Sequence, residues 1–348
     1  MSETRLTSFS KGGGCGCKIA PSVLQQIVQA TPNTFTNLLV GNESSDDAAV
    51  YQLNGETAII STTDFFLPIV DDPFDFGRIA AANAISDVYA MGGTPLMAIA
   101  ILGFPIDKLP LETAQQILAG GRSICTDANI PLAGGHTVDT AEPIFGLAVT
   151  GMAHTKNIKK NNGAQVGDIL FLTKPIGTGI LATALKKELL QPQHYEQLIQ
   201  QMTTLNTIGA QLGNVEGVHA MTDVTGFGLL GHALEMAEGS SVSMQLLYNA
   251  INKMEGIEDY LKQRTVPDAT FRNWNSYSKK VSFEKGVNVM EAFNVLPDPQ
   301  TNGGLLIAVA ESSVEEVKEI FLNRSLENQL QPIGKCTNIE EKSIKVLL

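Results

Sequence analysis

Runs typical of β-strands and runs typical of α-helices alternate along the whole chain, and this alternation limits the fold to α/β or α+β layers. In the first half, the strand-like runs lie at 48–53, 57–62, 96–103, 130–133 and 144–152. Helical periodicity covers 74–91 and 111–127, and Gly92, Gly93 and Pro95 supply the end signals of the first helix. The first half is therefore expected to form layers of strands and helices.

A polar, turn-rich stretch at 154–168 is the expected domain boundary. Beyond it, strand-like runs lie at 169–173, 218–221, 241–247 and 305–310, with short closing strands near 331 and 343. Helices are expected at 178–190, 194–212, 228–238 and 313–322. At 348 residues the chain is long enough for two domains of roughly 100–200 residues each. We predict an N-terminal loop and short helix (21–30) within 1–45, a first domain over 46–155 and a second over 166–348.

Charge and cysteine content exclude several classes of protein. The chain carries 24 Lys and Arg against 36 Asp and Glu, a net charge of −12, which argues against a general nucleic-acid binder. Its longest apolar run, 95–104, is far shorter than the roughly 20 residues of a membrane-spanning helix. The N-terminal residues lack the apolar core of a secretory signal, and four cysteines make no disulfide framework. We therefore expect a cytoplasmic protein.

A glycine-rich segment at 11–18, with the sequence KGGGCGCK, holds two cysteines and two lysines. Glycine gives such a run little conformation of its own, so it either bends around something or stays loose until something binds. Lys18 favours the thiolate of a neighbouring cysteine, and the thiolate is the reactive form. Taken alone, the segment fits a loose chain end and a reactive loop equally well.

Three common cofactor signals fit the sequence poorly. Cys15 and Cys17 could be half of a zinc site, but the other cysteines and the five histidines show no suitable spacing for further ligands. Gly177, Gly179 and Ala182 form GxGxxA after a strand, as in a dinucleotide fold, but a second helix follows where a parallel strand should, which favours a packing turn. No GxxxxGK[ST] phosphate loop is present. A redox pair of the two thiols is a further alternative.

Acidic residues flank a predicted β-hairpin. Its two strands are joined by Asn54-Gly55, a preferred pair for a tight turn. Asp46 and Asp47 precede the first strand, and Asp64 follows the second. Because the strands pair antiparallel, we expect these carboxylates at the same end of the sheet.

Asp87 on the first helix and Asp223 at a strand end extend this acidic set to five residues. A single Asp in such a place is usually a turn former, but five favour a shared role. Mg²⁺ commonly binds one or two carboxylates together with substrate phosphates, so the set predicts a polyphosphate site. His136, which follows Gly134 and Gly135, could contact a phosphate, although a lone histidine more often packs or caps.

Several motifs carry a family resemblance. They are GCGCKI at 14–19, NESSDDAAVY at 42–51, STTDFF at 61–66, NAISD at 83–87, AGGH at 133–136, MTDVTGFG at 221–228 and DPQT at 298–301. Together they resemble the selenophosphate synthetase (selenide, water dikinase) family of the aminoimidazole ribonucleotide synthetase-like superfamily. The Asp motifs alone resemble those of the whole superfamily. The Cys-Gly-Cys-Lys loop narrows the resemblance to the selenophosphate synthetase family. Lys11 and Asn302 stand where the family often has histidine and serine.

The resemblance implies a two-domain fold that dimerises through the first domain's sheet and binds ATP under a mobile glycine-rich loop. It implies the conversion of ATP, selenide and water to selenophosphate, AMP and phosphate, which supplies selenium for selenocysteine and selenouridine. Cys15 and Lys18 match the family's catalytic positions. Its nucleotide contacts match Lys18, Ser44, Ser45, Asp46, Asp64, Asp87, Gly134, Gly135 and His136. Its Mg²⁺ ligands match Asp47, Asp87 and Asp223.

Two alternatives stay open at this point. Another ATP-dependent kinase or ligase of the superfamily would share the Asp motifs. A thiol redox or selenium-carrier protein would use Cys15 and Cys17 without turning ATP over. A selenium-delivery protein is a further candidate partner, and nucleic acid and membranes are not expected partners.

Overall fold

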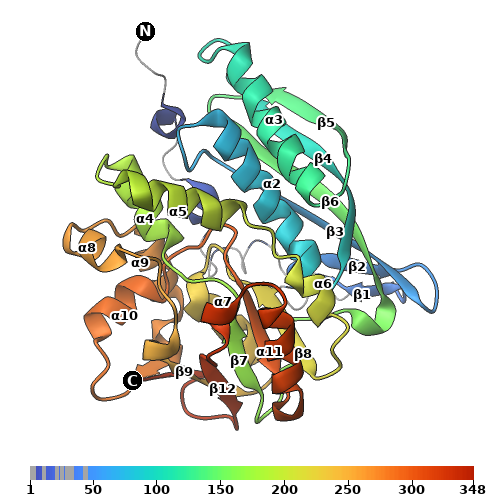
Figure 1. Ribbon diagram of the computed structural model, residues 1–348, viewed down its shortest axis with the longest axis vertical. Coiled ribbons are helices and arrows are strands. Elements are labelled where there is room, and N and C mark those ends of the chain that lie inside the picture. The colour runs from blue at the N-terminus through green and yellow to red at the C-terminus, as the bar shows by residue number, and fades with distance from the viewer. Residues whose placement is uncertain (1–4, 10–12, 20–22, 24–26, 28–34, 42–45) are drawn as a thin grey trace.

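The computed structural model describes residues 5–9, 13–19, 23, 27, 35–41 and 46–348. Almost all of the helix expected at 21–30, and the site candidates Ser44 and Ser45, lie outside the described residues. The described chain forms two α/β halves, one above the other in Figure 1, which confirms the expected fold class. Within these ranges, no helix combines the length and apolar character that crossing a membrane requires.

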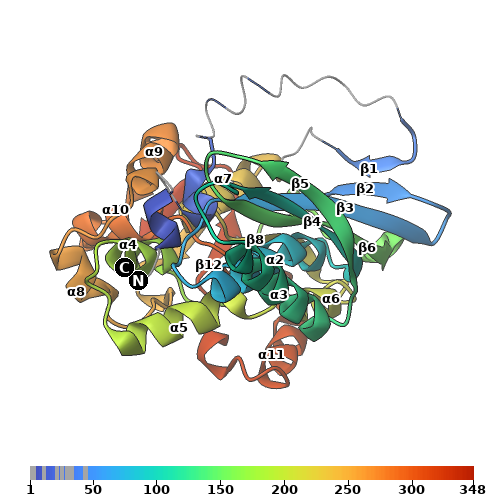
Figure 2. The ribbon, with the colours of Figure 1, turned by 90° about the horizontal axis from the view of Figure 1, so that it is seen from above.

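The first half is built on a six-stranded sheet with the order β1-β2-β3-β6-β4-β5. Its strands are β1 (Leu38–Val40), β2 (Ala49–Gln52), β3 (Thr57–Phe66), β4 (Thr94–Phe104), β5 (Leu132–Asp139) and β6 (Ile144–His154). Neighbours pair antiparallel except β4 and β5, which are parallel. Helices α2 (Pro73–Ala90) and α3 (Leu111–Asp127) cover one face of this sheet (Figure 2).

Several strands extend beyond their predicted ranges, and β3 and β5 extend the furthest. β3 pairs with β6 along its whole length, so Asp64 lies within the strand, opposite Leu147, and not after it. The Thr and Phe residues around Asp64 favour a strand, which explains the extension. β5 likewise contains Gly134, Gly135 and His136, which were expected to follow a strand. The hairpin is confirmed, because β2 pairs with β3 from Ala49 opposite Ser61.

α2 lies between the two halves and is buried over most of its length. It approaches α3 with backbone against backbone: a Cβ on Gly77 would lie 1.9 Å from the carbonyl oxygen of Ile117, and one on Gly120 would lie 1.9 Å from that of Phe74. On its other side, α2 contacts elements of the second half, β8 among them. α2 therefore carries the polar side chains of Asn83 and Asp87 to the junction of the halves.

The second half contains a seven-stranded sheet with the order β10-β13-β9-β12-β7-β11-β8. Its strands are β7 (Ile169–Leu172), β8 (Val218–Asp223), β9 (Ser243–Leu247), β10 (Val281–Phe283), β11 (Leu305–Val309), β12 (Gly334–Thr337) and β13 (Ile344–Leu347). Its helices are α4 (Thr178–Lys186), α5 (Pro192–Thr203), α6 (Ile208–Leu212), α7 (Gly228–Gly239), α8 (Ile257–Lys262), α9 (Asp268–Tyr277), α10 (Val289–Val295) and α11 (Val314–Leu322).

The GxGxxA sequence is a packing turn and no part of a dinucleotide fold. β7, the strand before it, is antiparallel to both of its neighbours, whereas a dinucleotide fold needs a parallel sheet. Gly177 has a φ of +130°, which favours glycine. A Cβ on Gly179 would lie 2.5 Å from Oδ1 of Asp298, so close approach explains that glycine.

Two segments of the second half differ from expectation. The single helix expected at 194–212 is interrupted between α5 and α6, where the buried Asn206 amide donates to Ser86 Oγ (2.8 Å) and to the Gly303 carbonyl (2.9 Å). No element was predicted for 268–277, yet α9 forms there and buries Asn273 and Tyr277. A contact with Ser86 of the first half divides the predicted helix, whereas α9 packs within the second half, where Asn273 and Tyr277 donate to carbonyls at 226 and 227.

Candidate active site

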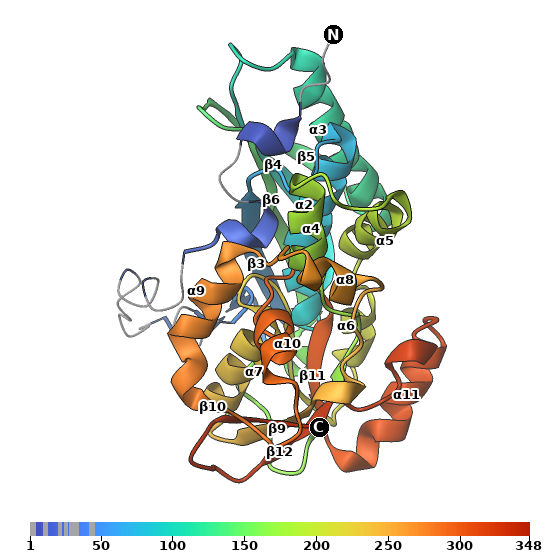
Figure 3. The ribbon, with the colours of Figure 1, turned by 90° about the vertical axis from the view of Figure 1, so that its left-hand side faces the viewer.

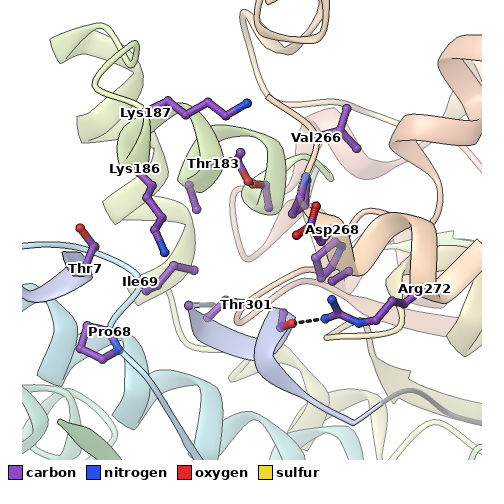
Figure 4. Close-up of a pocket in the computed structure, with 17 residues that line it drawn as sticks. Thr7, Pro68, Ile69, Thr183, Lys186, Lys187, Val266, Asp268, Arg272 and Thr301 are labelled. Atoms are coloured by element: carbon purple, nitrogen blue, oxygen red, sulfur yellow. Dashed lines mark hydrogen bonds between the residues drawn. The ribbon is translucent and has the colours of Figure 1, made fainter. Parts of the chain in front are cut away.

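The described part of the glycine-rich segment, residues 13–18, packs at the junction of the two halves (Figure 3). Gly14 N–H donates to the Leu67 carbonyl (3.1 Å), and Cys15 N–H donates to Thr301 Oγ1 (3.1 Å). Arg272 Nη2 donates to the Gly16 carbonyl (2.9 Å). Gly14 has a φ of +55°, a backbone conformation that favours glycine. The described part of the segment is therefore a loop bound to both halves and not a loose chain end (Figure 4).

Cys15 is the buried cysteine of this loop, with 1% of its surface exposed. Its Sγ donates to Asn83 Oδ1 at 3.2 Å. Burial raises the pKa of the Cys15 thiol well above its ordinary value, and the nearby Lys18 only partly opposes this. The expected thiolate is therefore not favoured in this closed arrangement, because desolvation outweighs the attraction of one ammonium.

Lys18 lies at the other end of the loop, and its Nζ is 3.7 Å from Asp64 Oδ1. Desolvation alone would lower the pKa of Lys18, but the carboxylate of Asp64 and other acidic groups outweigh it and raise that pKa. Asp64 Oδ2 also accepts a hydrogen bond from Asn83 Nδ2 at 2.6 Å. Asn83 therefore connects the thiol of Cys15 to the carboxylate that attracts Lys18.

Behind the loop lie Asp47, Asp64, Asp87 and Asp223, which we call the acidic cluster. They come from the approach to β2, from β3, from α2 and from the end of β8. Three of them accept hydroxyl hydrogen bonds: Asp47 from Thr222 (2.9 Å), Asp87 from Thr62 and Asp223 from Ser86 (2.6 Å). The hairpin and α2 thus bring together carboxylates that are far apart in sequence.

The cluster carries more negative charge than its surroundings balance. Burial raises the pKa of Asp47, Asp87 and Asp223, and the carboxylates also raise one another's pKa values. Asp47 Oδ2 is buried without a hydrogen-bond partner among the described residues. Mg²⁺ prefers hard oxygen ligands such as these carboxylates. A divalent cation would pair with the free oxygen of Asp47 and remove the repulsion between the carboxylates, so these residues fit Mg²⁺.

The described residues do not preassemble a metal cage, because no three or more His, Cys, Asp or Glu side chains among them are arranged to hold an ion. Mg²⁺ commonly takes one or two carboxylates, with substrate phosphates and water completing its shell. The arrangement therefore suits ions that are shared with a polyphosphate.

The remaining described candidates are Asp46, which adjoins the cluster and helps to raise the pKa of Asp47, and the Gly-Gly-His run of β5. Asp46 accepts a hydrogen bond from the backbone N–H of Asn161 at 2.8 Å. In the sheet, Asp64 of β3 pairs with Leu147 of β6, Leu147 pairs with Ala100 of β4, and Ala100 pairs with Gly135 of β5. Two strands, β6 and β4, therefore lie between Asp64 and Gly135. With about 4.8 Å between neighbouring strands, this separation is roughly 14 Å. Within one subunit the exposed Gly134, Gly135 and His136 therefore do not join the acidic cluster.

Sequence reasoning assigned no role to Asn83, Thr301 or Arg272, which all contact the loop or its cysteine. Asn83 shares a helix face with Asp87 at the i, i+4 spacing, and this was the available signal. Thr301 belongs to the DPQT motif. Arg272 has no local signal, because its contact with Gly16 joins residues far apart in sequence.

The sequence matches two family descriptions, "AIR synthase related protein, N-terminal domain" over residues 45–153 and "AIR synthase related protein, C-terminal domain" over 165–346. A structure of the HypE–HypF complex is similar, with a TM-score of 0.67 at 17% identity over 94% of this chain and 96% of that one. Thiamine-monophosphate kinase from Stenotrophomonas maltophilia K279a gives a TM-score of 0.63 at 19% identity, over 95% and 96%. Fold and site thus define an AIR synthase-related protein.

Closer relatives narrow this class. The chain is 56% identical over 322 residues to proteins named "Selenide, water dikinase" from Escherichia coli (strain K12) and Shigella flexneri, and the match covers 91% of this chain and 92% of each relative. The chain belongs to the selenide, water dikinase family.

Proposed function

We propose that this chain is a phosphotransferase that converts ATP, selenide and water to selenophosphate, AMP and phosphate, and so supplies selenium for selenocysteine and selenouridine. The observation that carries the proposal is the position of the glycine-rich loop, which places Cys15 beside Asn83 and Lys18 beside Asp64 of the acidic cluster. The 56% identity to proteins named selenide, water dikinase supports the choice of substrates.

The loop residues have separate tasks in this reaction. Phosphoryl transfer depends on positioning and on neutralising the charge of the phosphates, and the ammonium of Lys18 supplies part of that charge. Cys15 contacts the soft selenium nucleophile and guides it to the phosphate. The loop also keeps bulk water from the reacting atoms until the step in which one water releases phosphate. Asn83 positions both Cys15 and Asp64.

Asp47, Asp87 and Asp223 would hold Mg²⁺ together with the phosphates, and the unpaired Oδ2 of Asp47 supports this assignment. When bound, Mg²⁺ neutralises phosphate charge and orients the transferred group. Asp64, Asp87 and Lys18 also contact the nucleotide in this proposal. The remaining nucleotide contacts in this proposal are Ser44, Ser45, Asp46, Gly134, Gly135 and His136.

The proposal also includes a homodimer formed through the sheet of the first half, with domains over 46–155 and 166–348. The four cysteines are free, and both free thiols and selenide need a reducing compartment, which supports the cytoplasm. A selenium-delivery protein would be a further partner.

Phosphorus NMR of the purified protein with Mg²⁺ and ATP, with and without anaerobic selenide, tests the reaction. Selenide-dependent selenophosphate, AMP and phosphate are the expected products. Formation of ADP would instead identify a simple kinase. An unchanged ATP spectrum would identify a carrier that does not turn ATP over.

A further inference from the structure

Asn206 lies between α5 and α6, two helices that pack against α2 (Figure 1). Only 2% of its surface is exposed. Its Nδ2 donates to the Gly303 carbonyl (2.9 Å) in the second half and to Ser86 Oγ (2.8 Å) on α2 in the first half. A carbonyl oxygen can only accept, so the bond to Gly303 fixes which end of the amide faces Ser86. One side chain therefore donates to both halves.

The amide of Asn206 directs the hydroxyl hydrogen of Ser86. Ser86 is fully buried, and its Oγ lies 2.6 Å from Asp223 Oδ2. A serine hydroxyl has one hydrogen to donate, and the NH₂ group of an amide only donates. The Ser86 hydrogen is therefore left for the carboxylate of Asp223, which accepts it. Asp223 is one of the three proposed Mg²⁺ ligands.

The Ser86 bond also joins ligands from the two halves. Ser86 immediately precedes Asp87 in α2, and Asp87 is a second proposed ligand. Asp223 instead ends β8 in the second half. The two carboxylates repel each other, as the raised pKa of Asp87 reflects. A metal ion that takes both ligands needs them held against this repulsion, and the Ser86 hydroxyl supplies such a bond.

The carbonyl that anchors Asn206 is fixed to the backbone that carries Asp223. Gly303 packs so closely on the residue after Asp223 that a Cβ on Gly303 would lie 2.1 Å from the Val224 carbonyl oxygen. The Val224 N–H donates to the Gly304 carbonyl (2.8 Å). Asn206 thus links the Ser86 hydroxyl to the strand end on which Asp223 lies.

We propose that Asn206 is a positioning residue for the metal-binding carboxylate of Asp223 and that it acts through Ser86. The inference rests on the proposed function, which assigns Asp223 to Mg²⁺, and it adds the group that orients this ligand. Asn206 keeps the Ser86 hydroxyl on Oδ2, so the carboxylate of Asp223 does not rotate away from a shared ion. Groups that hold metal ligands from behind are typically worth roughly 10–100-fold in metal affinity.

Binding of Mn²⁺ tests the proposal without turnover, because Mn²⁺ takes the same oxygen ligands and its EPR signal separates free from bound ions. Each protein is mixed with a non-hydrolysable ATP analogue and titrated with Mn²⁺, and binding by the analogue alone is subtracted. In Asn206→Ala the dissociation constant for Mn²⁺ should rise about tenfold. Asn252→Ala removes an amide that binds residues 328 and 329 and should leave this constant unchanged. A wild-type constant in Asn206→Ala overturns the inference.

A double-mutant cycle tests whether Asn206 acts through Ser86. Ser86→Ala should weaken Mn²⁺ binding at least as much as Asn206→Ala does. Adding Asn206→Ala to Ser86→Ala should then cause no further loss, because the hydroxyl that Asn206 directs is already gone. Losses that add in the double variant would mean that Asn206 affects the site by another route, and they overturn the inference.

Asn206→Asp keeps the test open if Asn206→Ala does not fold. The two side chains have the same size, but the acid offers an acceptor to Ser86, so the hydroxyl hydrogen can turn away from Asp223. Mn²⁺ binding should weaken, whereas an added negative charge alone would strengthen it. Equal or tighter binding overturns the positioning role. Wild-type protein that binds no Mn²⁺ beyond the analogue alone refutes the metal assignment of the proposed function instead and removes this inference with it.

Discussion

Cys15 and Cys17 are separated by one residue, yet the structure gives them different surroundings. Cys15 is buried against Asn83, whereas Cys17 is exposed. We predict that Cys15→Ser lowers selenide-dependent AMP formation by at least about 100-fold, since it removes a group held at the reacting atoms. Cys17→Ser is the matched control and should keep most of the activity. Equal losses in the two variants, measured as AMP produced per minute, would contradict the assignment.

Asn83 is the residue on which the closed loop depends. Its Oδ1 accepts from Cys15 Sγ (3.2 Å) and from the Asn302 N–H (2.7 Å), while its Nδ2 donates to Asp64. Asn83→Ala leaves buried groups without partners and should lower the free energy of unfolding by about 1–3 kcal/mol. Asn294→Ala on α10 removes an exposed amide and should change it little. Urea unfolding of both variants checks this, and similar stabilities would refute it.

At the scale of residues, the sequence was enough to single out Cys15, Lys18 and the Asp residues, because rare combinations of thiol, ammonium and carboxylate are visible locally. Asn83 and Arg272 were not assigned, because their roles come from contacts with a loop far away in sequence. The protonation state of Cys15 was also not predictable, since burial decides it.

Among the elements, α2 and α3 depend on glycine for their close approach. A Cβ on Gly77 would lie 1.9 Å from a backbone oxygen of α3, so Gly77→Ala must move the helices apart. We expect a loss of about 1–3 kcal/mol of stability or more, the usual effect of overpacking. Gly55→Ala is the control, because a Cβ there meets nothing within 4 Å. Equal melting temperatures for the two variants would show that the helices can adapt.

The N-terminus of α4 is held by the loop at 298–300. Gly179 N–H donates to Asp298 Oδ2 (3.0 Å), and Gln300 Oε1 accepts from Gly177 and Thr178. Burial outweighs these bonds and raises the pKa of Asp298 to about 8. Between the ordinary value of 3.8 and about 8, the unfolded chain is therefore ionised at this residue while the folded chain is not. The folded state binds the extra proton, so this group lowers stability as pH rises through that window.

Asp298→Asn removes this titration. The difference in melting temperature between Asp298→Asn and wild type should therefore shift in favour of the variant from pH 5 to pH 8. Using the difference cancels the contributions of the other carboxylates. A difference that is the same at both pH values would mean that Asp298 is ionised in the folded protein.

Element types were mostly predictable, and their lengths were less so. Apolar alternation identified β3, but pairing with β6 set its end at Phe66. Helical periodicity suggested one helix at 194–212, while the contacts of Asn206 divide it. Local pattern therefore specifies the kind of element, and neighbouring elements specify where it ends.

For the whole molecule, the face of the first sheet away from α2 and α3 carries exposed apolar side chains on several strands. They include Tyr51, Phe65, Ile99, Val138 and Met152. Such a patch is typical of an interface between subunits, and it supports the proposed homodimer. Ile99→Glu should shift the protein to a monomer in light scattering, because a buried unpaired charge is costly. Leu322→Glu, at an exposed apolar residue of α11, is the control. A dimer that persists in Ile99→Glu would place the interface elsewhere.

The same dimer would explain why the Gly-Gly-His run of β5 lies roughly 14 Å from the acidic cluster of its own subunit, at the usual spacing of strands. If β5 of one copy completes the site of the other, each site takes Cys15 from one subunit and His136 from its partner. The substitutions Cys15→Ser and His136→Ala in different chains of a heterodimer then fall in the same site. Each variant alone should then be inactive or strongly impaired. Co-expressed with different affinity tags and purified as heterodimers, the pair should recover about half the wild-type rate, because one of the two sites is intact. If β5 serves its own subunit, each site of the heterodimer carries one lesion and no activity returns.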